Sequence, residues 1–330
     1  MTTVTLGKTG ITVNKNGFGA LPIQRITKEE AAKLLRKAYD GGITYFDTAR
    51  AYSDSEEKIG YALSDVRNHI YLATKTAATT AEGFWKDLET SLRLLKTDCI
   101  DVYQFHNPAV CPKPGDESGL YDAALKAREQ GKIRFISITN HRLAVANEAV
   151  DSGLYATLQF PFCYLCSEKD LELVEKCKKA DMGFIAMKAL SGGLINNSRA
   201  AYAFQAQYDS VLPIWGVQKE YELDEFLSYI DNPPVMDDEI RTLIENDRKQ
   251  LFGSFCRACG YCMPCPAGIE INTCANVPAS QKIPVPPPAH TGGTGEDDED
   301  QGLPPLRPLH EQVPVWSEYA GAAAEKPEGL

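Results

Sequence analysis

The sequence predicts an α/β protein built on a closed (β/α)8 TIM barrel with an N-terminal β-hairpin. Eight short β-rich runs alternate with amphipathic segments over the first 250 residues. Such alternation favours parallel strands, because each parallel crossover needs a connection as long as a helix. Eight units in about 250 residues fit a closed barrel. A doubly wound open sheet is the competing fold, but no expected strand is followed by a G-x-G-x-x-G turn.

Each expected element is recognised by its own pattern. The expected strands are 17–21, 44–48, 70–74, 99–105, 133–139, 156–160, 183–187 and 212–216. The clearest helical periodicity covers 28–40, 83–95 and 168–180. Ahead of the first strand, the segment 4–13 predicts a hairpin with Gly7 and Gly10 at its turn. We expect this hairpin to cover the amino end of the barrel.

Composition and charge narrow the class of partner. The 330 residues carry 34 Lys and Arg against 45 Asp and Glu, so the net charge is −11. An acidic chain is a poor match for nucleic acid, because phosphate binding needs a basic surface. No apolar run is long enough to span a bilayer, and the polar start MTTVTLGKTG lacks the pattern of a secretory signal. We therefore expect a cytoplasmic protein that binds neither nucleic acid nor membrane.

Polar side chains follow three successive expected strands at their carboxyl ends, where the active sites of such barrels lie. These residues are Asp47, Tyr52, Lys75 and His106. Taken singly, each has a structural interpretation: a histidine at a strand end is most often only hydrogen-bonded, and Asp47 with Lys75 could form a simple ion pair. Together they fit carbonyl reduction, which needs two donors and a nearby cation where negative charge develops on oxygen.

Three segments at these positions resemble the aldo-keto reductase family. They are FDTARAYSDSEEKIG (46–60), LATK (72–75) and YQFH (103–106), and the likeness extends over roughly residues 4–250. The resemblance implies an oxidoreductase that reduces a small aldehyde or ketone to an alcohol with hydride from NADP(H) or NAD(H). It also implies a role for each polar residue at the barrel edge.

Under this resemblance, Tyr52 is the general acid that protonates the carbonyl oxygen. Lys75 lowers the pKa of the Tyr52 phenol by placing a cation beside it, and Asp47 holds Lys75. His106 orients the carbonyl through a hydrogen bond. All four positions of the implied catalytic set are present in the chain.

The resemblance also implies where the nicotinamide cofactor binds. The implied residues are Thr139, Asn140, Gln159, Met187, Lys188, Leu190, Gly192, Gly216, Gln218 and Lys219. The chain departs from the family pattern at Met187, where a ring-stacking Tyr is usual, and at Gln218, where a basic residue is common. Lys219 could bind the 2′-phosphate of NADP(H) or be a solvated surface lysine. NADP(H) is therefore favoured over NAD(H) on one residue alone.

A dense cysteine cluster follows the barrel. Five of the ten cysteines fall within residues 256–274, and four form the run C-R-A-C-G-Y-C-M-P-C-P. These four are Cys256, Cys259, Cys262 and Cys265. The tight C-x2-C-x2-C spacing followed by Cys-Pro favours an iron–sulfur (4Fe-4S) cluster over zinc, whose cysteine pairs are usually separated by a longer gap. Unliganded thiols are the third interpretation. Two residues rather than three precede Cys265, which departs from the bacterial ferredoxin pattern.

The cysteine run also resembles the iron–sulfur branch of the aldo-keto reductases, in which a second run follows. The chain as written lacks a second run, so we expect the cluster site to be incomplete unless Cys265 or Cys274 completes it. We expect the cysteine-rich segment to relay electrons or to have a structural role. A one-electron cluster near a hydride site suggests coupling to an electron-transfer partner.

Three regions are therefore expected: a barrel over 1–250, a cysteine-rich ferredoxin-like segment over 251–276, and a tail over 277–330. The tail is rich in Pro, Gly and acidic residues, which predicts disorder. The alternative is a reading-frame shift near residues 275–276. A one-base shift can recode Leu303, Leu306, Leu309 and Val313 as cysteines at C-x2-C-x2-C-x3-C spacing. Codon degeneracy makes such recoding easy to find, so the nucleotide sequence decides between these interpretations.

A second functional hypothesis is a non-catalytic cofactor-binding or regulatory protein on the same scaffold. The four polar positions favour an enzyme, and Met187 is the sign against it. The identity of the substrate depends on rim loops such as 107–119, whose shape the sequence does not reveal.

Overall fold

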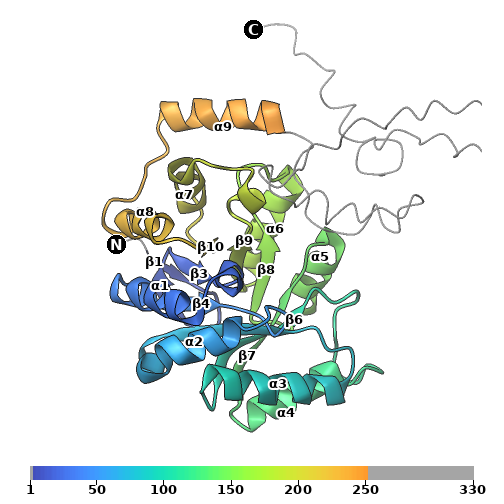
Figure 1. The fold of residues 1–330 in the computed structure, drawn as a ribbon. Helices are drawn as coiled ribbons and strands as arrows, with labels where there is room; N and C mark the ends of the chain where they lie inside the picture. Colours follow the sequence, from blue (N-terminus) through green and yellow to red (C-terminus); the bar gives the residue numbers. More distant parts are fainter. Residues whose placement is uncertain (1–2, 252–330) are drawn as a thin grey trace, which may run out of the picture. The chain divides into compact units, whose positions relative to one another are not determined.

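The computed structural model describes residues 3–251, which form a barrel preceded by a hairpin (Figure 1). The strands are β1 Thr3–Thr5, β2 Thr12–Asn14, β3 Gly17–Gly19, β4 Tyr45–Asp47, β5 Tyr71–Thr76, β6 Ile100–His106, β7 Ile133–Thr139, β8 Thr157–Pro161, β9 Gly183–Met187 and β10 Val211–Gly216. The helices are α1 Lys28–Asp40, α2 Ser55–Leu63, α3 Ala81–Leu95, α4 Leu120–Glu129, α5 Leu143–Ser152, α6 Glu168–Lys179, α7 Ser198–Ala206, α8 Glu220–Asp231 and α9 Asp238–Leu251.

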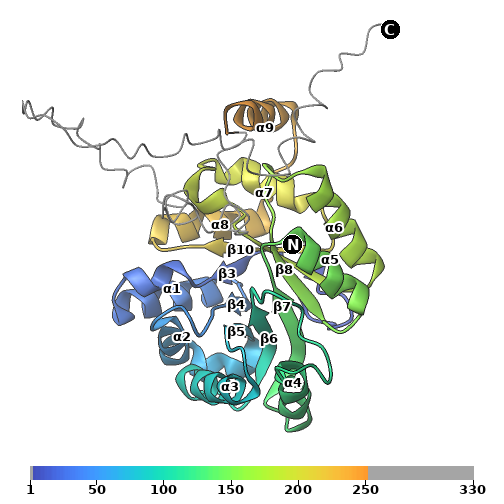
Figure 2. The same cartoon turned by 90° about the vertical axis from the view of Figure 1, so that its right-hand side faces the viewer.

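The strands β3 to β10 close into a barrel in the order β10-β3-β4-β5-β6-β7-β8-β9, and each neighbouring pair is parallel. Figure 2 shows the strands at the centre with the helices arranged around them. All eight strands expected from the sequence are present, with ends that differ by at most two residues. The predicted (β/α)8 barrel is confirmed.

Helix α1 illustrates how the local sequence builds the outer layer. Thr27 and Glu30 form a reciprocal capping box, in which each side chain accepts a hydrogen bond from the backbone N–H of the other residue. The helix then buries one face, made of Ala31, Leu34, Leu35 and Ala38. Residues spaced three or four apart lie on one side of a helix, so this face packs against the barrel.

The hairpin β1–β2 lies at the amino end of the barrel, as expected. Gly7 at its turn bridges to Met182, the residue before β9, and the Lys8 backbone N–H donates to the Asp181 carbonyl at 2.8 Å. Gly7 has a φ of +46°, and a Cβ there would collide with the Asp181 carbonyl. Glycine is therefore required at this contact.

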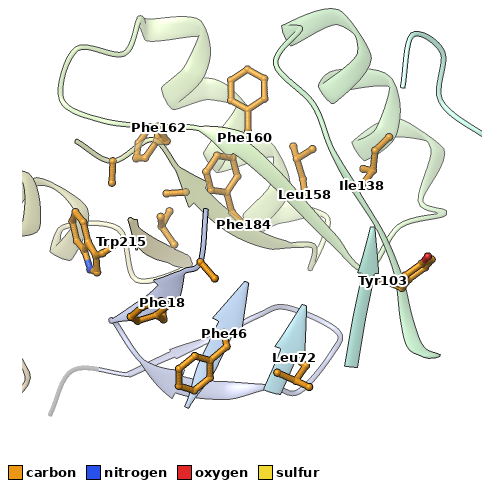
Figure 3. Packing of buried hydrophobic residues seen from close by; sticks show 14 of the residues in the cluster. Phe18, Phe46, Leu72, Tyr103, Ile138, Leu158, Phe160, Phe162, Phe184 and Trp215 are labelled. Carbon is orange, nitrogen blue, oxygen red and sulfur yellow. The ribbon is translucent and has the colours of Figure 1, made fainter. Parts of the chain in front are cut away.

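Side chains alternate between the helices and the barrel interior. Outward-facing residues such as Phe18, Phe46, Leu72, Leu158 and Phe184 belong to the large core between strands and helices (Figure 3). Inward-facing apolar residues join the hairpin in a second, smaller cluster. That cluster contains Val4, Leu6, Ile11, Val13, Tyr45, Ala73, Val102, Ile185, Met187, Leu212 and Ile214. The amino half of the interior is thus mainly apolar, and buried polar side chains such as Asp47 and Lys75 lie nearer the carboxyl end.

Two regions expected from the sequence lie outside the described residues. They are the cysteine-rich segment with Cys256, Cys259, Cys262 and Cys265, and the tail over 277–330. Within residues 3–251, no helix is both long and apolar enough to cross a membrane. In the same part of the chain, no three His, Cys, Asp or Glu side chains gather as a metal site would require.

Candidate active site

A buried ion pair lies at the carboxyl ends of β4 and β5. Lys75 Nζ donates to Asp47 Oδ1 at 2.5 Å and to the Thr48 carbonyl at 2.6 Å, and both charged side chains are almost completely buried. Asp47 and Lys75 come together because side chains alternate between the two faces of a strand, and both residues occupy inward positions on adjacent strands. A lysine held in this way places a fixed positive charge under the rim of the barrel.

Two glutamine amides complete the surroundings of Asp47. Gln104 Nε2 donates to Asp47 Oδ2 at 3.1 Å, and Gln159 Nε2 lies 3.4 Å from Asp47 Oδ1. Burial raises the pKa of the Asp47 carboxyl, while Lys75 and the two amides oppose that shift. Sequence reasoning missed Gln104, although its position two residues before His106 on one strand marks it as another inward-facing polar residue.

Tyr52 lies above this pair in the loop between β4 and α2. Lys75 Nζ is 5.4 Å from the centroid of the Tyr52 ring. Burial raises the pKa of Tyr52, and Lys75 lowers it. Lys75 therefore lowers the pKa of the phenol, as expected from the sequence. Burial has the larger effect, and the pKa stays above its usual value.

His106, the last residue of β6, stands edge-on to Tyr52. The two ring centroids are 5.9 Å apart, with an interplanar angle of 83°. Burial, followed by the positive charge of Lys75 and the neighbouring His141, lowers the pKa of His106 to about 3. The imidazole is therefore neutral at physiological pH, and a neutral imidazole has one N–H to donate.

The pKa of His106 predicts how stability depends on pH. Its folded-state pKa of about 3 lies below the ordinary value of 6.5, so the unfolded chain binds the extra proton first as pH falls. This stability is complete above about pH 6.5 and is lost as pH falls toward 3. In urea denaturation at pH 7 and pH 4.5, the parent should lose about 2 kcal/mol more than His106→Gln.

The matched control is His69→Gln, because His69 is exposed. It should lose as much stability as the parent between the two pH values. An equal loss in the parent and His106→Gln would contradict the assigned state of His106.

Three of the residues predicted to bind the cofactor meet on neighbouring strands. Thr139 pairs with Gln159 across β7 and β8, and Thr139 Oγ1 lies 3.9 Å from Met187 Sδ at the end of β9. All three side chains are buried. Among the described residues, Gln159 Oε1 has no hydrogen-bond partner, so it offers an acceptor to a bound ligand.

The Asn140 side chain is engaged within the protein. Its Nδ2 donates to the Pro108 carbonyl at 2.9 Å, and its Oδ1 accepts from the Arg142 backbone N–H at 2.9 Å. These contacts join the end of β7 to the loop after β6. The amide holds two rim loops together, an interaction that the sequence pattern did not reveal.

The remaining predicted cofactor residues occupy the loops after β9 and β10. Lys188, Leu190 and Gly192 lie in a tight turn, in which Lys188, Ser191 and Gly192 have positive φ. Within residues 3–251, Ser191 Oγ is buried without a hydrogen-bond partner. The backbone N–H groups of Ser191 and Gly193 donate within the turn, to the Lys188 carbonyl at 2.7 Å and the Leu190 carbonyl at 2.9 Å.

Gly216, Gln218 and Lys219 follow β10 and precede α8. The Glu222 carboxylate accepts from the backbone N–H groups of Gln218 and Lys219, both at 2.9 Å. A carboxylate therefore occupies the helix N-terminus, a position that would otherwise suit a phosphate. The contact involves the backbone of Lys219, and the binding of a 2′-phosphate by its side chain stays a prediction.

The fold and this site define a parallel barrel with a buried lysine, a tyrosine and a neutral histidine at its carboxyl edge. Residues 15–205, more than half of the chain, match the model of the Aldo/keto reductase family. The chain belongs to the Aldo/keto reductase family.

Curated relatives match part of the chain. It is 28% identical over 209 residues to L-galactose dehydrogenase of Arabidopsis thaliana, covering 58% of this chain and 66% of the relative. It is 29% identical over 205 residues to aldo-keto reductase str7 of Strobilurus tenacellus, covering 56% of this chain and 60% of the relative. The matches thus span less than two thirds of either relative.

Solved structures share the fold over a larger share of their length. An aldo-keto reductase from Bacillus halodurans, in its holo form, has a TM-score of 0.65 at 20% identity, covering 75% of this chain and 96% of that chain. An aldo-keto reductase from Klebsiella pneumoniae in complex with NADPH has a TM-score of 0.63 at 21% identity, covering 74% and 94%. At these identities the likeness concerns the fold.

Proposed function

We propose that this protein reduces the carbonyl group of a small aldehyde or ketone to an alcohol, using NADP(H) or NAD(H). The observation that carries the proposal is the stack of Asp47, Lys75 and Tyr52 beside a neutral His106. Tyr52 supplies an O–H that can donate a proton, and His106 supplies an N–H as a second hydrogen-bond donor. Lys75 supplies a buried positive charge where an oxygen anion would form. Among the relatives, the enzyme from Klebsiella pneumoniae has NADPH bound.

The residues present fit a nicotinamide cofactor. The buried and unpaired Gln159 Oε1 is an acceptor suited to a carboxamide N–H, and Ser191 Oγ is a donor suited to a phosphate. We assign Thr139, Asn140, Met187, Lys188, Leu190, Gly192, Gly216, Gln218 and Lys219 to the same site. The bound cofactor would supply the hydride that reduces the carbonyl carbon.

The chain's own residues supply the rest of the chemistry. Tyr52 donates its phenolic proton to the carbonyl oxygen, so that hydride and proton together convert C=O to CH–OH. Lys75 stabilises the phenolate that remains, and Asp47 fixes Lys75 in place. Because burial raises the pKa of Tyr52, the phenol is protonated before the reaction. Neutral His106 donates its N–H to the same oxygen and orients the substrate.

The test is the rate at which the purified full-length protein oxidises NADPH or NADH with a panel of aldehydes and ketones. Carbonyl-dependent oxidation with alcohol as product supports the enzyme. The second candidate, a non-catalytic cofactor-binding or regulatory protein, is supported if the protein binds cofactor but no carbonyl compound is turned over. Among the site residues, only Met187, in place of a ring-stacking Tyr, favours that candidate.

For the cysteine run, we propose a 4Fe-4S cluster with Cys256, Cys259 and Cys262 as ligands and Cys265 as a further one. The spacing supports it, and an electron-transfer partner would then be expected. After anaerobic reconstitution with iron and sulfide, the protein should become brown and hold about four iron atoms per chain. A Cys259→Ser variant should hold much less iron, and equal iron in both proteins would contradict the assignment.

A further inference from the structure

The turn that carries Tyr52 has an unfavourable backbone conformation. Ser53, the next residue, has a φ of +39°, a region that residues with a side chain rarely adopt. The turn is closed by hydrogen bonds from Tyr52 N–H to the Ala49 carbonyl at 3.0 Å and from Ser55 N–H to the Tyr52 carbonyl at 2.8 Å. Strained residues persist where surrounding contacts hold them, so the contacts of Ser53 identify what keeps Tyr52 in place.

The Arg50 side chain contacts the backbone of Ser53. Its Nη2 donates to the Ser53 carbonyl at 3.3 Å, and its backbone N–H donates to the Lys75 carbonyl at 2.9 Å. One residue thus joins the turn after Tyr52 to the strand that carries Lys75. The Ser53 side chain is less constraining, because its hydroxyl donates to Gln24 and Asp54 at the exposed surface.

The Arg50 guanidinium is in turn fixed by a buried carboxylate. Arg50 Nη1 pairs with Glu56 Oε2, and the Glu56 side chain is 1% exposed. Glu56 Oε1 accepts hydrogen bonds from Thr74 Oγ1 and Ser91 Oγ, both at 2.7 Å. Thr74 precedes Lys75 on β5 and points to the opposite side of the strand. The carboxylate is therefore anchored directly behind the lysine.

We propose that Arg50 and Glu56 are positioning residues for Tyr52: the anchored guanidinium holds the Ser53 carbonyl and thereby keeps the phenol above Lys75. The claim that this contact supports turnover rests on the proposed carbonyl reduction. The claim that Arg50 holds the turn in place does not depend on catalysis, because the strained turn, the hydrogen bond from Arg50 to Ser53 and the ion pair with buried Glu56 are properties of the folded chain. The two can therefore be tested separately.

The first experiment combines two substitutions. Arg50→Lys keeps a cation for Glu56 but loses the fork that reaches Ser53. It should lower kcat about tenfold, because small displacements of a reacting group are costly, with KM for the cofactor within about twofold of the parent value. Ser53→Gly removes the backbone penalty, so the double variant should regain most of the lost kcat.

The matched control is Arg36→Lys. The Arg36 guanidinium also joins a carbonyl, that of Ala62 at 2.8 Å, to a carboxylate, Asp65 at 2.5 Å, but it lies on α1. It should leave kcat unchanged. An undiminished kcat in Arg50→Lys, or a loss that Ser53→Gly does not repair, would overturn the proposal.

A second readout does not depend on turnover. In protein labelled with ¹³C at the tyrosine ring, the Tyr52 signal is identified by its absence from Tyr52→Phe. It should shift or broaden in Arg50→Lys and return toward the parent position in the double variant with Ser53→Gly. Identical spectra in parent and Arg50→Lys would refute the positioning role. If the parent reduces no carbonyl compound, the proposed function fails while this spectrum still decides the structural claim.

A further pair of substitutions covers the case in which Arg50→Lys does not fold. Arg50→Met together with Glu56→Gln removes both charges at once, so no buried carboxylate is left unpaired. This variant should show the same displaced Tyr52 signal and the same repair by Ser53→Gly. An unshifted signal would again overturn the proposal.

Discussion

Replacing Tyr52 by Phe should lower kcat for carbonyl reduction about 10³-fold, because the phenolic oxygen is the only atom removed and it is the proposed proton donor. Cofactor binding should remain close to that of the parent, since the ring stays in place beside His106. Steady-state kinetics and a fluorescence titration with reduced cofactor measure the two effects separately.

Tyr61→Phe is the matched control, because Tyr61 lies on α2 with half of its surface exposed. It should leave kcat unchanged. If Tyr52→Phe also retains full turnover, another group supplies the proton and the role assigned to Tyr52 is wrong.

Replacing Lys75 by Met should reduce the free energy of unfolding by about 3–5 kcal/mol, because it leaves the Asp47 carboxylate buried without its cation. The glutamine amides of Gln104 and Gln159 remain, but neutral donors compensate a buried charge only in part. Urea denaturation at pH 7 measures the loss. Lowering the pH should narrow the gap between parent and variant, because protonation of Asp47 removes the unpaired charge.

Lys113→Met tests whether the loss depends on burial. Lys113 Nζ pairs with Glu148 at 2.7 Å, close to the distance of the Lys75 pair, but both side chains are well exposed. Exposed pairs contribute at most about 1 kcal/mol. A loss in Lys75→Met no larger than that in Lys113→Met would show that the buried pair does not stabilise the barrel.

Hydrophobic periodicity was sufficient to predict the barrel and the position of its polar edge. Asp47, Lys75 and His106 could be placed together because each ends a strand, and parallel strands in one barrel present their carboxyl ends at one rim. Helix α1 was predicted with its observed ends from helical periodicity alone, and the structure adds the capping box that begins it.

Contacts between distant segments could not be predicted in the same way. The Asn140 amide donates to the Pro108 carbonyl, 32 residues earlier in the chain, and loop geometry decides that this partner lies within reach. Glu56 stands at the start of a helix, where the sequence alone suggests an exposed side chain. The packing of α2 against β5 and α3 is what buries it. For Gln104, the alternation of side chains along the strand is enough to predict an inward position, but the structure is needed to show its contact with Asp47.

The hairpin at the amino end of the barrel has a practical consequence for handling the protein. Because β1 begins at Thr3 and its turn contacts the residues before β9, a purification tag or a surface linker attached through the first residues would lie at the end opposite Tyr52 and His106. Immobilisation through that end would keep the attachment away from the mouth of the barrel. Small carbonyl compounds and cofactor could then be flowed over the captured protein without the attachment obstructing their entry.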